Sequence, residues 1–355
     1  MAIYKAIGVM SGTSLDGVDL AYVEFEKKQG KWSFKLGSYE SIRYSKGWEC
    51  RLNDLMNTSA LDYAKTHSDY GVFTGELLKS FIGKHDLKPD IIGVHGHTVF
   101  HRPDKGFTSQ IGDGAAIAAI TEQLIACDFR SMDVARGGQG APLVPIGDEL
   151  LFSEYDARIN IGGFANISFQ TQNGLLAYDI APANIILNPI ARKLGFEFDD
   201  QGKIAKGGDI NTELLNQLNS LPYYRQDAPK SLGKEWVDRE IVSFIPKDIS
   251  SSDLLRTYVE HISDQIVLAL EPLSTGKVLL TGGGAFNTFL MESIQEKTKL
   301  EIIVPQKKII EMKEAIIFAF LAVLRLLNKP NILTQVTGAS APSISGALYE
   351  GRVNV

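Results

Sequence analysis

The sequence predicts an α/β protein of two lobes, each built on a mixed β-sheet flanked by helices. Three observations support this fold class: the length of the chain, an order of elements that occurs twice, and glycine-rich turns at matching places. With 355 residues, the chain exceeds one core of usual size and suits two lobes of roughly 150 to 200 residues. Strand-like runs alternate with helical patterns in each half, which is typical of an α/β fold.

The repeated order begins with three predicted strands in each half. In residues 3–44 these strands are separated by the turns SGTSLDG and EKKQGK, and in 157–180 by GGFANI and QTQNG. Later, DIIGVHGHTVF at 90–100 and KVLLTGGGAFN at 277–287 each read as a buried strand that runs into a glycine turn. This shared order predicts a duplicated architecture with a central cleft, where turns of both sheets converge on a ligand.

Apolar spacing and polar starts predict helices at 62–82, 113–124, 184–194, 254–273, 287–297 and 313–327. The segment SMDVARGGQGAPLVPIG, at 131–147, is rich in Gly and Pro and predicts a hinge. The expected lobes are therefore 1–132 together with 330–355, and 133–329.

Composition narrows the kind of partner. The formal net charge of -6 argues against a nucleic-acid or anionic-membrane surface, because such partners select for concentrated Lys and Arg. The apolar run 315–327 contains Arg325 and is shorter than the ~20 residues of a membrane span, so we expect a buried helix. Cys50 and Cys127 are expected to be free thiols, and the N-terminus lacks a secretory pattern. A cytoplasmic protein with a small-molecule ligand is expected.

The first glycine turn joins two predicted strands with small and hydroxyl residues. Such a turn can direct backbone N–H groups and hydroxyls to one point and hold a phosphate. Carboxylates near it suit Mg²⁺, and we expect Asp16 to hold the ion through water. A plain hairpin turn, in which Gly and Asp satisfy backbone geometry, explains the same residues. The expected nucleotide contacts are Gly12, Thr13, Ser14, Leu15, Asp16, Gly17, Val18 and Asp19.

Two further glycine turns complete the predicted nucleotide site. Asn160, Gly162 and Gly163 lie in the second hairpin, while Gly282, Gly283, Gly284 and Asn287 lie between a strand and a helix. Neither the Rossmann nor the P-loop glycine motif occurs in its required setting. Two phosphate hairpins and a strand–Gly–helix turn are the pattern of the actin, sugar-kinase and heat-shock ATPase superfamily. The sequence therefore predicts a two-lobed actin-like (ribonuclease H-like) fold that binds ATP.

Longer motifs carry a more specific resemblance. In order, they are MSGTSLDGVD, HGHTVFHRP, QIGDGAAIA, DFRSMDVARGGQGAPLVP, NIGGFANIS, TGGGAFN and KEAIIFAFLA. With these motifs, the sequence resembles the anhydro-N-acetylmuramic acid kinases of bacterial cell-wall recycling over nearly its whole length. The resemblance implies that ATP, Mg²⁺ and water convert 1,6-anhydro-N-acetylmuramic acid to N-acetylmuramic acid 6-phosphate and ADP. It also implies a homodimer.

The resemblance assigns the catalytic role to Asp179, which would act as general base on water. In the family this residue opens a segment similar to Asp-Thr-Gly-Pro-Gly-Asn, whereas this chain has Asp179-Ile180-Ala181-Pro182-Ala183-Asn184. These departures leave open that the enzyme phosphorylates a different amino sugar or anhydro sugar. A structural alternative is that Asp179 caps the helix beginning near Asn184 or ties down the turn.

The residues expected to face the sugar are His97, Gln110, Asp113, Arg130 and Glu314. The Arg130 guanidinium is expected to bind the lactyl carboxylate of a muramic acid through two parallel hydrogen bonds. A solvated salt bridge is an equal alternative for Arg130, and capping of the following helix is an alternative for Glu314.

Two other classes of protein share parts of this sequence pattern. The motif His95-Gly96-His97, with His101 close behind, would place two imidazoles on one face of a strand, as in metal-dependent hydrolases. After His101 only His261 follows in the later sequence to complete a site. A sugar-sensing repressor on the same fold would need a basic helix-turn-helix, which the sequence does not display.

Overall fold

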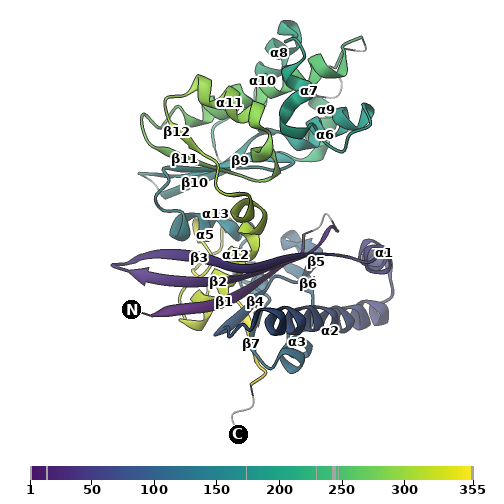
Figure 1. The fold of residues 1–355 in the computed structure, drawn as a ribbon, viewed down its shortest axis with the longest axis vertical. Helices are drawn as coiled ribbons and strands as arrows, with labels where there is room; N and C mark the ends of the chain where they lie inside the picture. Colours follow the sequence, from purple (N-terminus) through teal and green to yellow (C-terminus); the bar gives the residue numbers. More distant parts are fainter. Residues whose placement is uncertain are drawn as a thin grey trace. The chain divides into compact units, whose positions relative to one another are not determined.

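The computed structural model describes residues 2–12, 15–172, 174–228, 230–241, 245–246 and 248–352. Thr13 and Ser14 of the first predicted phosphate turn lie outside these residues. The chain divides into two compact units (Figure 1). Unit 1 consists of Met1–Phe152 and Met312–Val355, and unit 2 consists of Ser153–Glu311.

Unit 1 is built on a six-stranded sheet with the strand order β13-β7-β4-β1-β2-β3 and a separate hairpin of β5 and β6. Its strands are β1 (Ile3–Met10), β2 (Gly17–Lys28), β3 (Lys31–Arg43), β4 (Ile91–Val94), β5 (His97–Arg102), β6 (Phe107–Ile111), β7 (Leu124–Cys127) and β13 (Ala347–Glu350). Its helices are α1 (Lys46–Asp54), α2 (Ala60–His85), α3 (Gly114–Thr121), α4 (Ser131–Ala135), α5 (Val144–Leu151) and α13 (Thr334–Thr337), joined by most of α12 (Lys307–Leu326).

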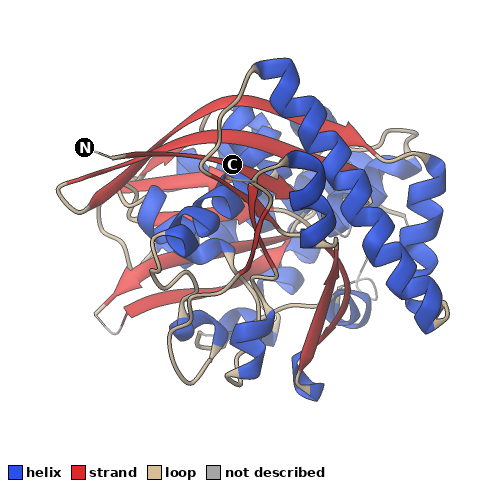
Figure 2. Ribbon diagram, turned by 90° about the horizontal axis from the view of Figure 1, so that it is seen from below, coloured by secondary structure: helices blue, strands red, loops and turns tan. Residues whose placement is uncertain are grey.

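Alternation along β1 and β4 determines which helix covers each face of this sheet. Ile7 and Ile92 share a core cluster with Leu78 of α2. Their neighbours Gly8 and Gly93 face α12, where a Cβ atom would lie 1.7 Å from the Ala315 carbonyl oxygen and 2.2 Å from that of Phe318. Only glycine permits this approach. The apolar run that begins at Ala315 is thus a buried helix, as predicted. Figure 2 shows helices, in blue, packed against the strands, in red.

Unit 2 contains a five-stranded sheet with the order β10-β9-β8-β11-β12. Its strands are β8 (Ala157–Ile161), β9 (Phe164–Thr171), β10 (Gly174–Pro182), β11 (Lys277–Thr281) and β12 (Glu301–Ile303). Its helices are α6 (Asn184–Lys193), α7 (Lys203–Lys206), α8 (Thr212–Asn219), α9 (Lys234–Glu240), α10 (Ser251–Leu270) and α11 (Thr288–Lys297).

The two sheets confirm the predicted duplication. In unit 1 the chain runs through an antiparallel meander of β1, β2 and β3, and then adds β4 and β7 parallel to β1. In unit 2 it forms the same meander with β8, β9 and β10, and then adds β11 and β12 in parallel. The fold is therefore the predicted α/β fold of the actin-like type, with mixed sheets flanked by helices. The cleft predicted between the lobes stays a prediction.

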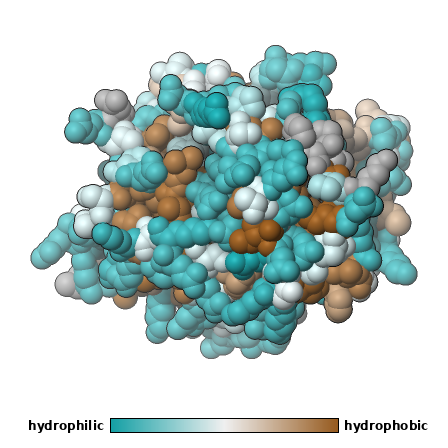
Figure 3. Space-filling view, turned by 90° about the horizontal axis from the view of Figure 1, so that it is seen from above, coloured by the Kyte–Doolittle hydropathy of each residue, from teal (hydrophilic) through white to brown (hydrophobic). Residues whose placement is uncertain are grey.

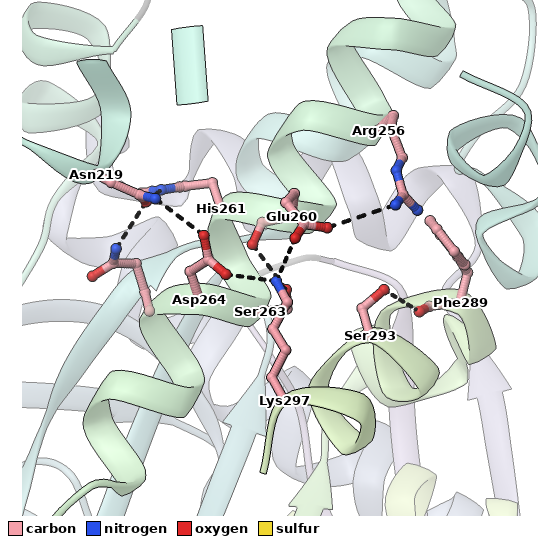
Figure 4. Close-up of polar contacts among 10 residues, drawn as sticks. Asn219, Arg256, Glu260, His261, Ser263, Asp264, Phe289, Ser293 and Lys297 are labelled. Atoms are coloured by element: carbon pink, nitrogen blue, oxygen red, sulfur yellow. Dashed lines mark hydrogen bonds and ion pairs between the residues drawn. The ribbon is translucent and has the colours of Figure 1, made fainter. Parts of the chain in front are cut away.

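Helices α10 and α11 of unit 2 are joined by a polar cluster (Figure 4). The Lys297 ammonium, at the end of α11, lies 2.6 Å from Glu260 Oε1 and 2.5 Å from Asp264 Oδ1, and it donates to Ser263 at 2.6 Å. On the same helix α10, directly after Glu260, the buried imidazole of His261 bonds to Asn219 at 2.6 Å and to the Tyr224 hydroxyl at 2.9 Å. The carboxylates and the hydroxyl satisfy a half-buried cation, which fixes α11 against α10.

The boundaries between the units differ from the predicted lobes 1–132 with 330–355, and 133–329. The segment 131–147 is not the boundary, because α4 and the start of α5 form within it and α5 packs in unit 1. The ring of Phe152 lies 5.4 Å from that of Phe34, and Asp148 pairs with Lys313 at 2.7 Å. The later boundary falls at residue 312, since α12 packs on β1 and β4 from there.

The six predicted helices all form, although α12 begins six residues before the predicted start at 313. Among the described residues, no helix has the length and apolar character that a bilayer span requires. The face drawn in Figure 3 is largely hydrophilic, with apolar side chains gathered in several separate areas.

Candidate active site

Ser11 organises the first glycine turn, directly after β1. Its hydroxyl bonds to the Tyr44 hydroxyl at 2.7 Å and to Nδ1 of His97 at 3.1 Å, and Tyr44 in turn bonds to Tyr70 at 2.5 Å. All four side chains are buried, so each polar group has its partner inside unit 1. This chain of hydrogen bonds holds the predicted sugar residue His97 against the start of the turn.

The rest of this turn shows both backbone constraint and open polar groups. Gly17 has a φ of 149°, and a Cβ atom there would lie 2.1 Å from the Ile42 carbonyl oxygen. The Val18 side chain is in the core, so only its backbone is available to a ligand. The Asp16 carboxylate is exposed, and Asp19 accepts a hydrogen bond from Ser41 at 2.5 Å. The hairpin geometry thus explains Gly17, and the phosphate role of the turn stays a prediction.

Arg130 is held by a neutral histidine. Its Nε and Nη2 groups donate to Nε2 of His95 at 3.2 and 2.9 Å, and its Nη1 donates to the Gly140 carbonyl at 2.7 Å. Nδ1 of His95 donates to the Ser11 carbonyl at 3.3 Å. Burial, together with the Arg130 charge, lowers the pKa of His95 to about 3. An uncharged imidazole can accept from Arg130, and it does not itself offset the positive charge of the guanidinium.

Glu314 of α12 supplies the opposite charge near Arg130. Burial lowers the pKa of Arg130, while Glu314 acts to raise it. Desolvation raises the pKa of Glu314, against the lowering influence of Lys313 and Arg130. Glu314 lies seven positions beyond the start of α12 at Lys307, so it does not cap that helix. An arginine and a carboxylate in one region can together bind a ligand that has both a carboxylate and hydroxyl groups.

A cavity of about 240 Å³ lies beside this group. His95 and Gln110 line it, and Gln110 donates to Thr108 at 2.8 Å. Asp113 has a structural role, since its Oδ1 accepts from the N–H groups of Ala115 and Ala116 and caps α3. The predicted sugar residue Gln110 therefore lines the same cavity as His95. Asp113 caps a helix through Oδ1, and its contact with the sugar stays a prediction.

Asp179 lies near the end of β10, where a bulge interrupts the pairing with β9. Its Oδ2 accepts from the Leu232 N–H at 2.9 Å, and no hydrogen bond to Oδ1 is found among the described residues. Burial raises the pKa of this carboxyl, and the Leu232 N–H acts to lower it. No side chain caps α6, whose N-cap is Ala183. The helix-capping alternative for Asp179 is therefore wrong, and the carboxylate keeps one oxygen for a ligand or water.

The turn between β8 and β9 lies against the start of α6. The carbonyl oxygen of Gly162 accepts from the Asn184 N–H at 3.1 Å, and that of Gly163 accepts from the N–H groups of Ala183 and Ile185 at 2.8 and 3.1 Å. Asn160, at the end of β8, is half-buried. These carbonyls orient the turn against α6, and the predicted phosphate contacts of Asn160, Gly162 and Gly163 stay predictions.

The three consecutive glycines after β11 are not equivalent. Gly282 has a φ of 84°, and its Cβ atom would lie 2.6 Å from the Ile161 carbonyl oxygen. A Cβ atom at Gly284 would lie 2.3 Å from Cγ2 of Ile161. Gly283 is exposed, and its Cβ would meet Asn184 at 3.8 Å, which is ordinary contact. Gly282 and Gly284 are thus required for packing, whereas Gly283 leaves its backbone open to a ligand.

Gly283 opens onto a pocket of about 730 Å³ within unit 2. This volume lies in the range of ~300 to 1,000 Å³ that is usual for small-molecule sites. The aromatic side chains Phe198 and Phe286 line the pocket although they are 54% and 36% exposed. Asn287 also lines it, but its Oδ1 accepts from the Leu290 N–H at 3.0 Å and caps α11. Exposed aromatic rings beside an open glycine backbone suit a flat ligand.

Several residues of these sites were not found from the sequence. Tyr44 and Tyr70 support His97, while Phe198 and Phe286 line the large pocket. Tyr44, Tyr70 and Phe198 lie in segments without a glycine motif, whereas Phe286 lies within TGGGAFN. The roles of all four side chains arise from contacts between elements that are distant in the sequence. Lys307, which also lines the pocket, gave no signal beyond its charge.

The metal-hydrolase alternative is not supported by the geometry of its histidines. His95 follows β4, whereas His97 begins β5 after Gly96, so the two imidazoles do not share a strand face. Nε2 of His95 accepts from Arg130 and is not available to a metal. The described part of the chain contains no cluster of three or more His, Cys, Asp or Glu side chains suited to a metal ion.

Comparisons with known proteins agree with the resemblance seen in the sequence. The family model described as anhydro-N-acetylmuramic acid kinase matches residues 4–351. The anhydro-N-acetylmuramic acid kinase of Photobacterium profundum is 36% identical over 98% of this chain and 99% of its own length. That of Zymomonas mobilis is 33% identical over 97% and 99%.

Among solved structures, the chain is similar to component A of the (R)-2-hydroxyglutaryl-CoA dehydratase from Acidaminococcus fermentans. The TM-score is 0.45 at 11% identity, with 90% of this chain and 97% of the other chain covered. The match of the family model over nearly the whole chain, together with these relatives, shows that the protein belongs to the anhydro-N-acetylmuramic acid kinase family.

Proposed function

We propose that this kinase converts 1,6-anhydro-N-acetylmuramic acid, water and ATP to N-acetylmuramic acid 6-phosphate and ADP, with Asp179 as the general base. Asp179 accepts a proton from water, and the water oxygen forms a bond to the anomeric carbon of the sugar. The bond from that carbon to the bridging O6 breaks, and its electron pair stays on O6. O6 bonds to the γ-phosphorus as the bond from phosphorus to ADP breaks.

The observation that carries this proposal is the environment of Asp179. A general base needs a fixed carboxylate with an available oxygen and a pKa moved toward the working pH. The Leu232 N–H fixes Oδ2 at 2.9 Å, and burial raises the pKa of the carboxyl. Oδ1 is thus the oxygen that would take the proton from water.

The large pocket of unit 2 is the proposed site of the adenosine portion of ATP. Phe198 and Phe286 offer apolar contact to a base, and Gly283 lets the nucleotide approach the backbone. Hydroxyl and backbone groups of the two hairpin turns would hold the phosphates. The pocket therefore places the open glycine beside two aromatic side chains, which suit the flat face of a purine base.

Mg²⁺ belongs to the proposal as the usual partner of ATP. Mg²⁺ commonly uses one or two carboxylates, waters and phosphate oxygens. The exposed carboxylate of Asp16 fits this limited demand and would hold the ion through water. When bound, the ion would neutralise phosphate charge.

The departures of this chain from the family's catalytic segment affect the core of unit 2. Ile180 is 2% exposed, and Ala181 and Ala183 are fully buried. Their side chains pack in the same core cluster. This burial favours the family's sugar over a different one, because the changed side chains are turned into the protein.

For the sugar, Arg130 is the proposed partner of the lactyl carboxylate, while His97, Gln110 and Glu314 are proposed to contact its hydroxyl and amide groups. We also propose a homodimer in the cytoplasm. Both free cysteines, Cys50 and Cys127, are consistent with a reducing compartment.

Turnover of 1,6-anhydro-N-acetylmuramic acid with ATP and Mg²⁺ in ¹⁸O-labelled water tests the function. We expect a 6-phosphate that contains one labelled oxygen at the anomeric position, identified by mass. Product without label would contradict the hydrolytic step. No product, with ATP still bound, would point to another amino or anhydro sugar, which assays of such sugars would identify.

A further inference from the structure

Asp179 lies on an edge strand whose outer side is covered by an irregular segment. β10 is an edge strand of the five-stranded sheet, and among the described strands β9 alone pairs with it. The bulge between Asp179 and Ala181 releases this part of β10 from regular pairing, as bulges commonly do where a side chain is re-aimed. Among the described residues, those of 222–232 bond to the free edge here.

Three contacts tie Asp179 to this segment. The Asp179 N–H donates to the Lys230 carbonyl at 3.1 Å, and the Tyr223 hydroxyl donates to the Asp179 carbonyl at 2.5 Å. The Leu232 N–H donates to Oδ2 at 2.9 Å. Both backbone polar groups and one carboxylate oxygen of Asp179 are thus bonded by a segment that begins more than 40 residues later.

Lys230 holds the segment together. Its ammonium donates to the carbonyl oxygens of Tyr223 and Gln226 at 3.1 and 3.0 Å and lies 4.7 Å from the centroid of the Tyr223 ring. The Tyr223 ring also packs on Trp236, with ring centroids 5.4 Å apart. Tyr223 is only 4% exposed, so its hydroxyl has a fixed position.

We propose that Tyr223, Lys230 and Leu232 form the positioning element of the general base, and that Tyr223 is its principal positioning residue. This inference rests on the proposed function, because it takes Asp179 as the base. Tyr223 fixes the backbone of Asp179, while Leu232 fixes Oδ2, so the rotation of the carboxylate is restricted and Oδ1 is kept toward water. Tyr223 touches no reacting atom and acts through Asp179.

The titratable groups around Asp179 are Tyr178 on its own strand and Tyr223 and Lys230 on the segment. Burial raises the pKa of both tyrosines and lowers that of Lys230. The tyrosines remain protonated where the enzyme works, so Asp179 is the one of these groups that titrates in the acidic limb of a pH profile.

The test compares Tyr223→Phe with Tyr224→Phe. Tyr224 is a matched control, since it is buried next in sequence and its hydroxyl bonds to His261. In Tyr223→Phe we expect kcat to fall about tenfold, the effect of losing one buried hydrogen bond to the residue that acts as the base. The KM values should stay within about twofold of those of the wild type. The acidic limb of kcat should move to lower pH, because looser packing hydrates Asp179. Tyr224→Phe should keep the wild-type kcat and limb.

A second readout does not depend on turnover. Amide hydrogen exchange in 222–232 should increase in Tyr223→Phe and in Lys230→Met, but not in Tyr224→Phe. If the wild-type protein turns over no sugar, the proposed function fails, whereas the exchange result still reports whether Tyr223 holds the segment. The inference would be overturned if Tyr223→Phe had the same kcat, the same acidic limb and the same amide exchange as the wild type. It would also be overturned if Tyr224→Phe lost as much kcat as Tyr223→Phe.

Discussion

Arg130 donates through two of its nitrogens to one nitrogen of His95, Nε2, at distances of 3.2 and 2.9 Å. Because His95 is neutral, this pair fixes the guanidinium without cancelling its charge. Arginine positioned in this way is ready to bind an anionic group of a ligand. Arg130 is therefore expected to distinguish sugars that have a carboxylate from sugars that lack one.

Replacing Arg130 by Met should raise KM for 1,6-anhydro-N-acetylmuramic acid by about 10- to 100-fold, the effect of losing a hydrogen-bonded charge partner. The same change should have little effect on 1,6-anhydro-N-acetylglucosamine, which has no lactyl carboxylate. Steady-state kinetics with both sugars make the comparison. Equal losses for the two sugars would contradict pairing between Arg130 and the carboxylate.

Replacing Asp179 by Asn should lower kcat at least about a hundredfold, because the general base is lost. ATP affinity should remain near the wild-type value, since this change leaves the glycines and aromatic walls of the pocket in place. Calorimetric titration with ATP, beside the turnover assay, separates binding from chemistry. Retained turnover would refute the role of Asp179.

The same substitution should stabilise the protein at neutral pH. Burial raises the folded-state pKa of Asp179 above that of the unfolded chain. Its ionised form therefore opposes folding, and this cost is absent below the unfolded pKa and develops as pH rises through the folded pKa. Thermal unfolding should show a higher Tm for Asp179→Asn than for wild type at neutral pH, with the difference shrinking in mild acid. A lower Tm at neutral pH would show that the ionised carboxylate stabilises the fold.

Alanine substitutions should separate the roles of neighbouring glycines after β11. Gly284→Ala should lower Tm, because the new Cβ would lie 2.3 Å from Ile161. Gly283→Ala should keep Tm and raise KM for ATP, because Gly283 is exposed on the pocket. Thermal melts and ATP kinetics of both variants measure these effects. A large fall in Tm for Gly283→Ala, with unchanged KM, would reverse the assignment.

Phe198 and Phe286 should contribute to ATP affinity through their rings. Each change to Ala should raise KM for ATP by about 5- to 150-fold, given ~1 to 3 kcal/mol for a stacked base. Phe196 offers a control, since it is 56% exposed and is not among the residues that line the pocket. Phe196→Ala should match wild type in an ATP-binding titration. Equal affinity in all three variants would place the base elsewhere.

The sequence by itself determined the repeated order of strands, the glycine turns and the family. These features depend on local periodicity and on motifs that are continuous in the chain. The sequence could identify the turns at Gly17 and Gly282, because glycine is the residue that such backbone conformations need. It could also identify the apolar helix after Ala315 from the run of apolar residues. The predicted lobe boundary at 131–147 differs from the boundary of the compact units. Gly and Pro indicated a hinge there, but α5 packs in unit 1 and extends that unit to Phe152.

Only the tertiary structure decided which polar groups meet. The bond between Tyr223 and Asp179 spans 44 residues, and that between Arg130 and His95 spans 35. Burial, which raises the pKa of Asp179 and keeps His95 neutral, is likewise a property of the packed units. A motif names the residue that can do chemistry, but the distance, orientation and desolvation that adapt it to the task come from elements brought together by folding.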